Sequence, residues 1–593
     1  MSSAPASPPD DPPAGPAAGG LASGPSASAA SDPLRLQRLL PFLAWPRPTP
    51  ALLRSEALVG LTVGMMMLPQ AVAYAQLAGM PPAAGVYASL LPALAGALFS
   101  ASTRLSVGPT ALSSLLVSAS LTGLAAPGSA QWVLLAVWLA LMAGALQLAL
   151  GLARFGWLLN LVSTPVLMAF THGTAALIIA TQAPHLLGLE GWDWGSLSAR
   201  GWHGASAVYG VLSLAALLLV RRWRPAFPSV LALLMLTSAL SWLTGFEAGG
   251  GAVIGELPRS LPTLALPEWP GLAALSHLVL PMFVLGLVSF LETAASARVD
   301  NARKGVRWQR DQDLIGQGLA KLASAFSGGF STSTSFTRSA LNLYAGAQTG
   351  WAAVFTVLTV LAAFMLLTPV LRHVPQAVLT AIIVAAVAGL IKPREYRRLW
   401  RVSRAEAVMA LLTVALTIAT APALYWGVLA GVLMTLARFV YQRLHPRIVE
   451  VGLYADGSLR NRHPYGLPLL APHTLALRMD AALDFATANS FEQYVDAMLA
   501  ARPGTQHVVL LAQSINRLDA TGAETLTRLL VQARSHGIGW HLVGCKRPVR
   551  QALRAAGVLG EKPLAAHYRT EAQLLAALAR LEQGPPDLAA LAI

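Results

Sequence analysis

One long stretch of the chain, from Ala57 to Gln182, is almost free of charged residues. It contains no aspartate or glutamate, and its only formal charges are Arg104 and Arg154. Soluble domains carry about 25% charged residues, whereas this chain of 593 residues carries 12%. Several apolar segments of bilayer length, about 20 residues each, fit into the stretch. The chain is therefore predicted to be an integral membrane protein that contacts the lipid bilayer.

The charge of the chain agrees with this prediction. The formal net charge is +15 and the pI is about 10.5, values that also occur in nucleic-acid-binding proteins. Here, however, the basic residues form short clusters between apolar segments, for example at Arg221 and Arg222. The positive-inside rule explains such clusters, so no nucleic-acid partner is expected. A single cysteine, Cys545, excludes a disulfide framework and a multi-cysteine metal site.

Apolar segments recur from about Leu58 to Tyr441, and fourteen is the number most consistent with their spacing. Connections on one side are basic, whereas the two longest on the other side, 183–204 and 246–273, carry acids such as Glu190 and Asp193. An even number of spans with both termini in the cytoplasm satisfies this asymmetry. The segments are expected to start near Leu58, Pro82, Val107, Gln131, Leu158, Ala205, Phe227, Leu275, Gln312, Phe336, Gly350, Pro375, Arg404 and Leu424.

Composition divides the chain into four parts. Residues 1–33, rich in Pro, Ala, Ser and Gly, are expected to form a disordered tail, followed by a transmembrane domain at 34–445 and a linker at 446–465. Residues 466–585 have the composition of a soluble α/β domain. Strands are predicted at 473–479, 507–515 and 540–545, and helices at 523–537 and 547–557, each ended by a glycine.

Two apolar segments are unusually short and interrupted by small polar residues. They are "LSVGPTALSSLLVSAS" (105–120) and "GGFSTSTSFTRSALNLYAG" (328–346). By count they are the third and tenth segments, the third of each half in a seven-plus-seven arrangement. Paired interruptions at matching positions of inverted repeats indicate a transporter binding site. In each segment we expect an extended stretch and then a helix, beginning near Pro109 and near Phe336.

The two helix starts are expected to face one another near the middle of the bilayer, where their free N–H groups attract an anion. Arg338, in the first turn of the second helix, adds a positive charge that is costly in a bilayer unless an anion compensates it. Ser335, Thr337, Ser339 and Thr110 offer hydrogen bonds to an oxyanion. In the alternative interpretation, the small residues only allow close helix packing and Arg338 extends to the membrane interface.

Several runs resemble those of the SulP-type sulfate permeases, bacterial relatives of pendrin and prestin. The resemblance covers about residues 38–580. Two positions depart from it: Lys321 stands where members often have asparagine, and Thr334 where they often have glycine. The matching runs are "LPQAVAYAQLAGMPPAAGVYASLLP" (68–92), "LSVGP" (105–109), "DLIGQGLAKLASAFSGGFSTSTSFTRSALNLYAGAQT" (313–349), "LTPVLRHVPQAVLTAIIVAAVAGLI" (367–391) and "LDATG" (518–522).

This resemblance implies a uracil-permease-like inverted repeat of fourteen segments, with a core domain that moves against a gate domain. It also implies a cytoplasmic STAS domain, commonly a homodimer, and a place in the bacterial inner membrane. The anion would lie between the third and tenth spans. The family's substrate-binding positions then correspond to Pro109, Thr110, Ser335, Phe336, Thr337, Arg338 and Ser339, with Gln70, Tyr74 and Gln76 from the first span.

Glu292 is the only acidic residue in its apolar segment, "GLVSFLETAASAR" (286–298). A carboxylate in hydrocarbon readily takes up a proton, as a proton carrier must. The resemblance points the same way, since proton-coupled members have a glutamate in "FLE". Alternatively, Glu292 stays ionised or hydrogen-bonded and only orients Arg338 or a serine. His172 is a weaker candidate, because a lone histidine among small residues is usually a hydrogen-bonded packing residue.

Thr521 in "LDATG" stands where related anti-anti-sigma proteins have a phosphorylatable serine. A phosphate there would lie at a helix N-terminus, which suits its charge. In the alternative, Asp519 and Thr521 cap the helix and the domain serves trafficking, dimer stability or the binding of a regulatory protein.

Secondary active transport of a small anion, sulfate first, with H⁺ as the coupling ion and no cofactor, is the leading functional prediction. Elevator-like alternating access would carry the anion. Bicarbonate or dicarboxylate transport, anion exchange, and an uncoupled channel remain alternatives. No enzyme is expected, because no constellation of nucleophile, base and metal and no Walker motif is present in the sequence.

Overall fold

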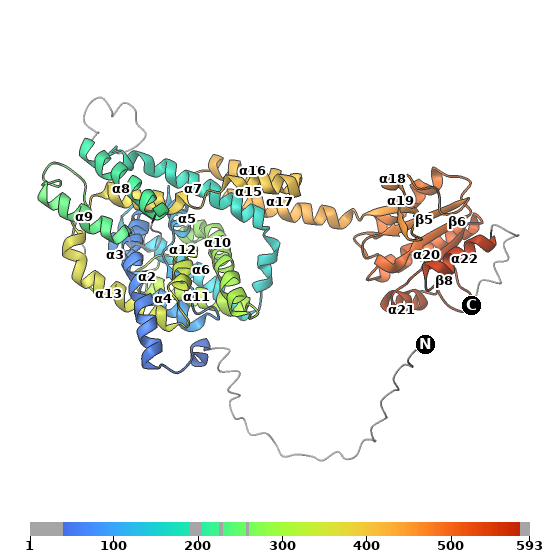
Figure 1. The fold of residues 1–593 in the computed structure, drawn as a ribbon, viewed down its shortest axis with the longest axis horizontal. Coiled ribbons are helices and arrows are strands. Elements are labelled where there is room, and N and C mark those ends of the chain that lie inside the picture. Colours follow the sequence, from blue (N-terminus) through green and yellow to red (C-terminus); the bar gives the residue numbers. More distant parts are fainter. Residues whose placement is uncertain (1–39, 190–202, 224–228, 257–259, 582–593) are drawn as a thin grey trace, which may run out of the picture. The chain divides into compact units, whose positions relative to one another are not determined.

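The computed structural model describes residues 40–189, 203–223, 229–256 and 260–581. The predicted tail at 1–33, the acidic residues Glu190 and Asp193, and residues 582–585 of the predicted α/β domain lie outside these ranges. The chain divides into two compact units, Met1–Leu159 with Ala175–Leu390 and Asn160–Thr174 with Ile391–Ile593. Figure 1 shows the helices and strands of the described residues, coloured along the sequence.

Helices are the main elements of the first unit. Among the described residues, seven helices of the chain are long and apolar enough to cross a membrane. A helix overlaps each of the fourteen predicted segments, but the number of spans stays a prediction. The helices of this unit are α2 (Pro50–Leu77), α3 (Pro82–Tyr87), α4 (Leu91–Phe99), α5 (Ala111–Leu121), α6 (Ala130–Leu152), α8 (Gly204–Trp223), α9 (Ser229–Leu243), α10 (Leu272–Lys304), α11 (Arg310–Phe326), α12 (Phe336–Tyr344), α13 (Trp351–Leu371) and α14 (Gln376–Ala388), with the short 3₁₀ turn η1 (Pro41–Ala44) before them. The chain passes between the units at three points: within the 3₁₀ turn η2 (Gly156–Leu161), within the helix α7 (Thr164–Leu186) and after Leu390.

Small residues bring helices of the first unit close together. A Cβ atom at Gly318 of α11 would lie 2.6 Å from the backbone N of Leu148 on α6, and one at Gly144 of α6 would lie 2.9 Å from the carbonyl O of Gly318. Likewise, a Cβ at Gly60 of α2 would lie 2.4 Å from Phe355 Cβ on α13. Such contacts are typical of helices that pack in a bilayer, where no hydrophobic force drives association.

The second unit contains the first part of α7, a group of helices before the sheet, and a mixed sheet with helices of its own. The helices are α15 (Pro393–Val402), α16 (Arg404–Ala419) and α17 (Tyr425–Leu444). The sheet has the order β4-β3-β5-β6-β7-β8. Its strands are β3 (Ile448–Leu453), β4 (Leu459–Asn461), β5 (Thr474–Met479), β6 (His507–Leu511), β7 (Gly539–Val543) and β8 (Ala566–Tyr568), and its helices are α18 (Arg462–Tyr465), α19 (Ala488–Ala500), α20 (Ala520–Ser535), α21 (Arg547–Ala555) and α22 (Glu571–Leu581), with a 3₁₀ turn η4 (Ala512–Ser514).

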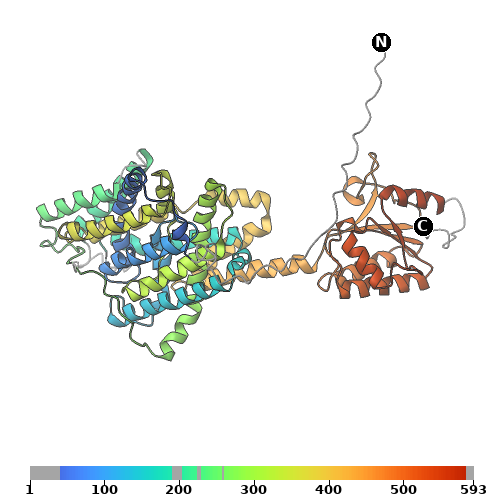
Figure 2. The same ribbon diagram turned by 90° about the horizontal axis from the view of Figure 1, so that it is seen from below.

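Helices cover both faces of this sheet (Figure 2). One core joins alternate strand residues such as Leu475 and Leu477 to Phe491 of α19, Leu529 of α20 and Leu553 of α21. The other face packs Ala476, Val509 and Val543 against Leu574 and Leu578 of α22. Because successive side chains of a strand point to opposite faces, this alternation produces a three-layer domain. The predicted strands and helices of the α/β domain are present, although the strand from 507 ends at Leu511 and continues as a 3₁₀ turn.

The predicted linker at 446–465 is not an unstructured connection. It contains β3 and β4, and β3 pairs antiparallel with β5 through Ile448–Met479 and Glu450–Leu477. Val451 is 1% exposed within this sheet. The α/β domain therefore begins near Ile448, about one hairpin earlier than the sequence suggested, because β3 contributes apolar side chains that are buried against the strands that follow.

Candidate functional site

The two interrupted segments meet in the first unit, where a short two-stranded sheet joins them. β1 (Val107–Gly108) and β2 (Ser333–Thr334) pair antiparallel, with Val107 opposite Thr334 and Gly108 opposite Ser333. The backbone N–H of Ser335 donates to the carbonyl of Ser106 at 3.0 Å, which extends the pairing by one residue. As predicted, each segment is extended first and helical afterwards.

Hydroxyl side chains cap both helices at the end of this sheet. The Thr110 Oγ1 accepts a hydrogen bond from the Ser113 N–H at 3.2 Å at the start of α5. The Ser335 Oγ accepts one from the Arg338 N–H at 3.4 Å at the start of α12. Each cap satisfies one of the donors that a helix start leaves free, so further N–H groups remain available at both ends. Two partial positive charges of helix dipoles are thus concentrated at one place.

Arg338 connects the two segments and is 1% exposed. Its Nη2 donates to the Pro109 carbonyl at 2.9 Å, its Nε to Ser106 Oγ at 3.3 Å and its Nη1 to Gln70 Oε1 at 3.3 Å. A guanidinium has five N–H donors, so these bonds leave two for a ligand. Ser339 Oγ accepts from the Ser106 N–H at 3.0 Å, which fixes the first turn of α12 against the same loop.

Glu292 lies on α10 beside the start of α5. Its Oε2 accepts a hydrogen bond from Thr110 Oγ1 at 3.2 Å. Glu292 interacts electrostatically with Arg338 and with Lys321 of α11, and Tyr74 of α2 interacts with Glu292 and Arg338. A carboxylate, a guanidinium and two capped helix starts therefore share one buried region of the first unit.

Most of the predicted site residues converge here. Gln70, Pro109, Thr110, Ser335, Arg338, Ser339 and Glu292 are joined by the hydrogen bonds described above, and Tyr74 lies within electrostatic range. The side chains of Phe336 and Thr337 are exposed, although Thr337 Oγ1 lies within hydrogen-bond distance of Ser335 Oγ at 3.3 Å. Gln76 is partly buried on α2, and its side chain has no hydrogen bond in the described part of the chain.

Other polar residues of the region were not predicted as part of the site. Ser106 bonds to both Arg338 and Ser339. Gln147 of α6 and Ser289 of α10 both accept hydrogen bonds from the Lys321 ammonium. In the sequence, each of them is an uncharged polar residue inside an apolar segment. This pattern alone does not indicate a binding site, because Ser and Gln in such segments are often only packing residues.

His172 lies in the second unit and has partners on both ring nitrogens. Its Nδ1 is 3.0 Å from the Tyr396 hydroxyl, and its Nε2 accepts from the Lys392 N–H at 3.3 Å. These hydrogen bonds are consistent with a packing residue, which is the usual role of a lone histidine among small residues.

In the α/β domain, Asp519 caps α20. Its Oδ1 accepts from the Gly522 N–H at 2.9 Å and its Oδ2 from the Phe485 N–H at 3.0 Å. Burial would raise the pKa of Asp519, but these N–H groups and Arg517 lower it overall. Thr521 lies in the first turn of α20 and is exposed. The phosphorylation of its hydroxyl stays a prediction.

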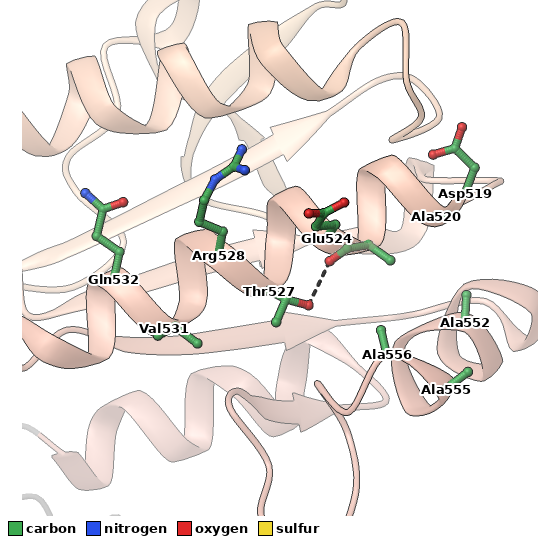
Figure 3. A pocket seen from close by; sticks show the side chains of 11 residues that line it. Asp519, Ala520, Glu524, Thr527, Arg528, Val531, Gln532, Ala552, Ala555 and Ala556 are labelled. Carbon is green, nitrogen blue, oxygen red and sulfur yellow. Dashed lines mark hydrogen bonds between the residues drawn. The ribbon is translucent and has the colours of Figure 1, made fainter.

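A cavity of about 860 Å³ adjoins this helix, between α20 and α21 (Figure 3). Along α20, Asp519 lies at one end of the cavity, and Glu524, Arg528 and Gln532 follow in that order toward the other end. Ala552, Ala555 and Ala556 line the opposite side. In the described ranges no group of three or more His, Cys, Asp or Glu side chains is placed to hold a metal ion.

The fold and the site define a multi-pass membrane protein of the anion-transporter type with a C-terminal STAS domain. The chain belongs to the sulfate permease family, whose model matches residues 53–413, and a STAS domain model matches residues 470–571. The proteins of this family are transporters rather than enzymes, as the sequence predicted.

Relatives and solved structures agree with this assignment. A Mycobacterium tuberculosis protein named as a probable sulfate transporter is 31% identical over 517 residues, which cover 86% of this chain and 92% of the relative. The chloroplastic sulfate transporter 4.1 of Arabidopsis thaliana is 28% identical and covers 85% and 77%. The fold matches that of the murine anion transporter Slc26a9 in its inward-facing state, with a TM-score of 0.82, 19% identity and coverage of 94% and 96%. The transmembrane domain of the cyanobacterial bicarbonate transporter BicA matches with a TM-score of 0.55, 20% identity and coverage of 65% and 98%.

Proposed function

We propose that this protein is a secondary active transporter that carries a small anion, with sulfate as the first candidate, across the bacterial inner membrane. The observation that supports this most is the buried Arg338 at the meeting point of the α5 and α12 N-termini. A guanidinium with two N–H groups left for a ligand, together with two positive dipole ends, suits an oxyanion. Sulfate comes first because relatives that span most of this chain are named as sulfate transporters.

Coupling to protons would run through Glu292. While no anion is bound, the ionised carboxylate balances part of the positive charge of the site. When an anion arrives, protonation of Glu292 removes a negative charge from its vicinity, so one proton accompanies the anion. The Thr110 hydroxyl, which caps α5 and bonds to Glu292, links the two events. Movement of the anion-bearing helices relative to the rest of a homodimeric carrier, with both termini in the cytoplasm, would give alternating access. The STAS domain would bind a regulatory protein or stabilise the dimer.

The purified protein in proteoliposomes provides the test. Radiolabelled sulfate, bicarbonate, nitrate, chloride and a dicarboxylate are offered with an inward proton gradient, with a sodium gradient and with neither. The proposal predicts sulfate uptake above the equilibrium level when the proton gradient is present. Equilibration without accumulation under every gradient would instead identify an uncoupled channel. Accumulation driven only by an opposing anion gradient would identify an exchanger.

A further inference from the structure

Lys321 is a second buried cation beside the site. It lies on α11 and is 0% exposed, so its ammonium has no access to water. The Nζ donates to Gln147 Oε1 of α6 at 2.9 Å and to Ser289 Oγ of α10 at 2.7 Å. By contrast, Lys392, the residue before α15, is exposed, as a lysine usually is. A buried ammonium is costly unless it is both hydrogen-bonded and compensated by an opposite charge.

The surrounding hydrogen bonds fix the ammonium in place. The Gln147 Nε2 donates to the Gly286 carbonyl at 2.7 Å and to Ser289 Oγ at 2.9 Å. These bonds turn the Gln147 Oε1 toward Lys321, so the amide serves as an acceptor for the ammonium. Three helices, α6, α10 and α11, thus hold one positive charge.

The compensating charge is Glu292. The charged groups that interact with Glu292 are Lys321 and Arg338, and Lys321 has Glu292 as its charged partner. Two cations and one carboxylate give the site a net charge of +1 when Glu292 is ionised and +2 when it is protonated. Without Lys321, the same site would have net charges of 0 and +1. Tyr74, the other titratable neighbour, adds no charge in its neutral form.

We propose that Lys321 is a specificity-determining residue that adapts this site to doubly charged oxyanions. With Glu292 protonated, the fixed charge of the site equals that of a divalent anion, so the loaded site is neutral inside the bilayer. The proposal rests on the proposed function, because it assumes that an anion binds at Arg338. Lys321 is a positioning charge in this account, since its own hydrogen bonds go to Gln147 and Ser289.

Coulomb's law makes this inference quantitative. The interaction of one fixed charge with an anion is proportional to the charge of the anion at a given distance. Loss of the Lys321 charge therefore costs a divalent anion twice the free energy that it costs a monovalent one. A free-energy cost that is twice as large squares the fold-loss of affinity. If a monovalent anion binds about 10-fold more weakly without the charge, a divalent anion should bind about 100-fold more weakly.

The experiment compares the half-saturating concentrations of sulfate and nitrate for uptake into proteoliposomes at one pH. Lys321→Gln removes the charge, and Gln147→Glu neutralises it while the lysine stays in place. Both variants should lower the preference for sulfate over nitrate by about tenfold or more. Lys321→Arg keeps the charge and should largely keep the preference. Lys392→Gln, at an exposed lysine, serves as the matched control and should behave like the wild type.

Equal losses for sulfate and nitrate in both neutralised variants would overturn the proposal and leave Lys321 a structural residue. The same holds if the variants only lower the melting temperature while the preference stays unchanged. If the wild type itself transports neither anion, the proposed function fails, and the assignment of Lys321 fails with it. The two failures are thus distinguishable from the wild-type measurement alone.

Discussion

At the scale of single residues, the position of Glu292 leads most directly to a testable prediction. Its carboxylate contacts the cap of α5 and interacts with both buried cations. Glu292→Gln keeps the size and removes the exchangeable proton. We expect uptake driven by a proton gradient to fall to background, while exchange of labelled for unlabelled anion continues. Uptake and counterflow in proteoliposomes measure the two separately.

The matched control for this variant is Glu395→Gln, at an exposed carboxylate on α15. It should leave both measurements unchanged. Survival of gradient-driven uptake in Glu292→Gln would show that Glu292 has only a structural role in orienting its neighbours.

His541 is expected to make the α/β domain less stable in acid. It is 2% exposed on β7, with Nε2 3.2 Å from His507 Nδ1. Burial, and then the neighbouring His507, lowers the pKa of His541 to about 4, against about 6.5 in an unfolded chain. As the pH falls, the unfolded state therefore takes up the proton before the folded state does. The contribution of the neutral His541 to the free energy of unfolding is fully present above about pH 6.5 and decreases as the pH falls toward 4. The loss is roughly 3 kcal/mol.

Hydrogen exchange of the β6 and β7 amides, corrected for the intrinsic effect of pH, measures this loss. His541→Leu should flatten the profile between pH 6.5 and 4, whereas His536→Gln, at an exposed histidine, should not. An equally steep profile in His541→Leu would assign the acid sensitivity to other groups.

Some of these residues could be predicted from the sequence and others could not. Arg338 and Glu292 stand out because a charge in an apolar segment is rare and costly. Lys321 was noted only as a departure from the related proteins. Its partners Gln147 and Ser289 lie 174 and 32 residues away along the chain, so only the packing of α6, α10 and α11 brings them together.

At the scale of elements, the interrupted segments were predicted as extended stretches followed by helices, because Pro109 and the serine-rich run prevent continuous helices. The pairing of β1 with β2 was not predicted. Each strand has two residues, and the segments are far apart in the sequence. Two residues are too few to show the alternation of polar and apolar side chains that is typical of a strand. The register between β1 and β2 is therefore determined only when the surrounding helices pack together.

The contact between α6 and α11 positions Lys321, and it depends on glycine. In Gly318→Ala the new Cβ would lie 2.6 Å from the Leu148 N and 2.8 Å from the Gly144 carbonyl. Backbone atoms cannot move aside easily, so the helices must separate. We expect a loss of about 1–3 kcal/mol, seen as a lower melting temperature in detergent. In Gly286→Ala the nearest atom is the Leu146 Cδ2 at 3.4 Å, and stability should be unchanged; equal effects of both substitutions would contradict this account.

At the scale of the whole molecule, composition alone predicts that a helical membrane part comes first and that an α/β domain follows it. The start of the α/β domain was misplaced, because the stretch around β3 carries charges that resemble a linker. In the structure Glu450 is 1% exposed and paired with Arg462 and Arg502. Burial would raise the pKa of Glu450, but the hydrogen bonds from these arginines lower it overall. A charge that is buried with its partners cannot be told from a solvated one by sequence.

The central claim is that the anion binds at Arg338. Uptake of labelled sulfate by proteoliposomes, compared between the wild type and Arg338→Ala, tests it most directly. The matched control is Arg394→Ala, at an exposed arginine on α15. Loss of a charged hydrogen-bond donor to the ligand costs about 3 kcal/mol, or roughly 100-fold in affinity. The account predicts that loss for Arg338→Ala, with protein that still elutes as a folded species, and wild-type uptake for the control. Undiminished sulfate uptake by Arg338→Ala would contradict it.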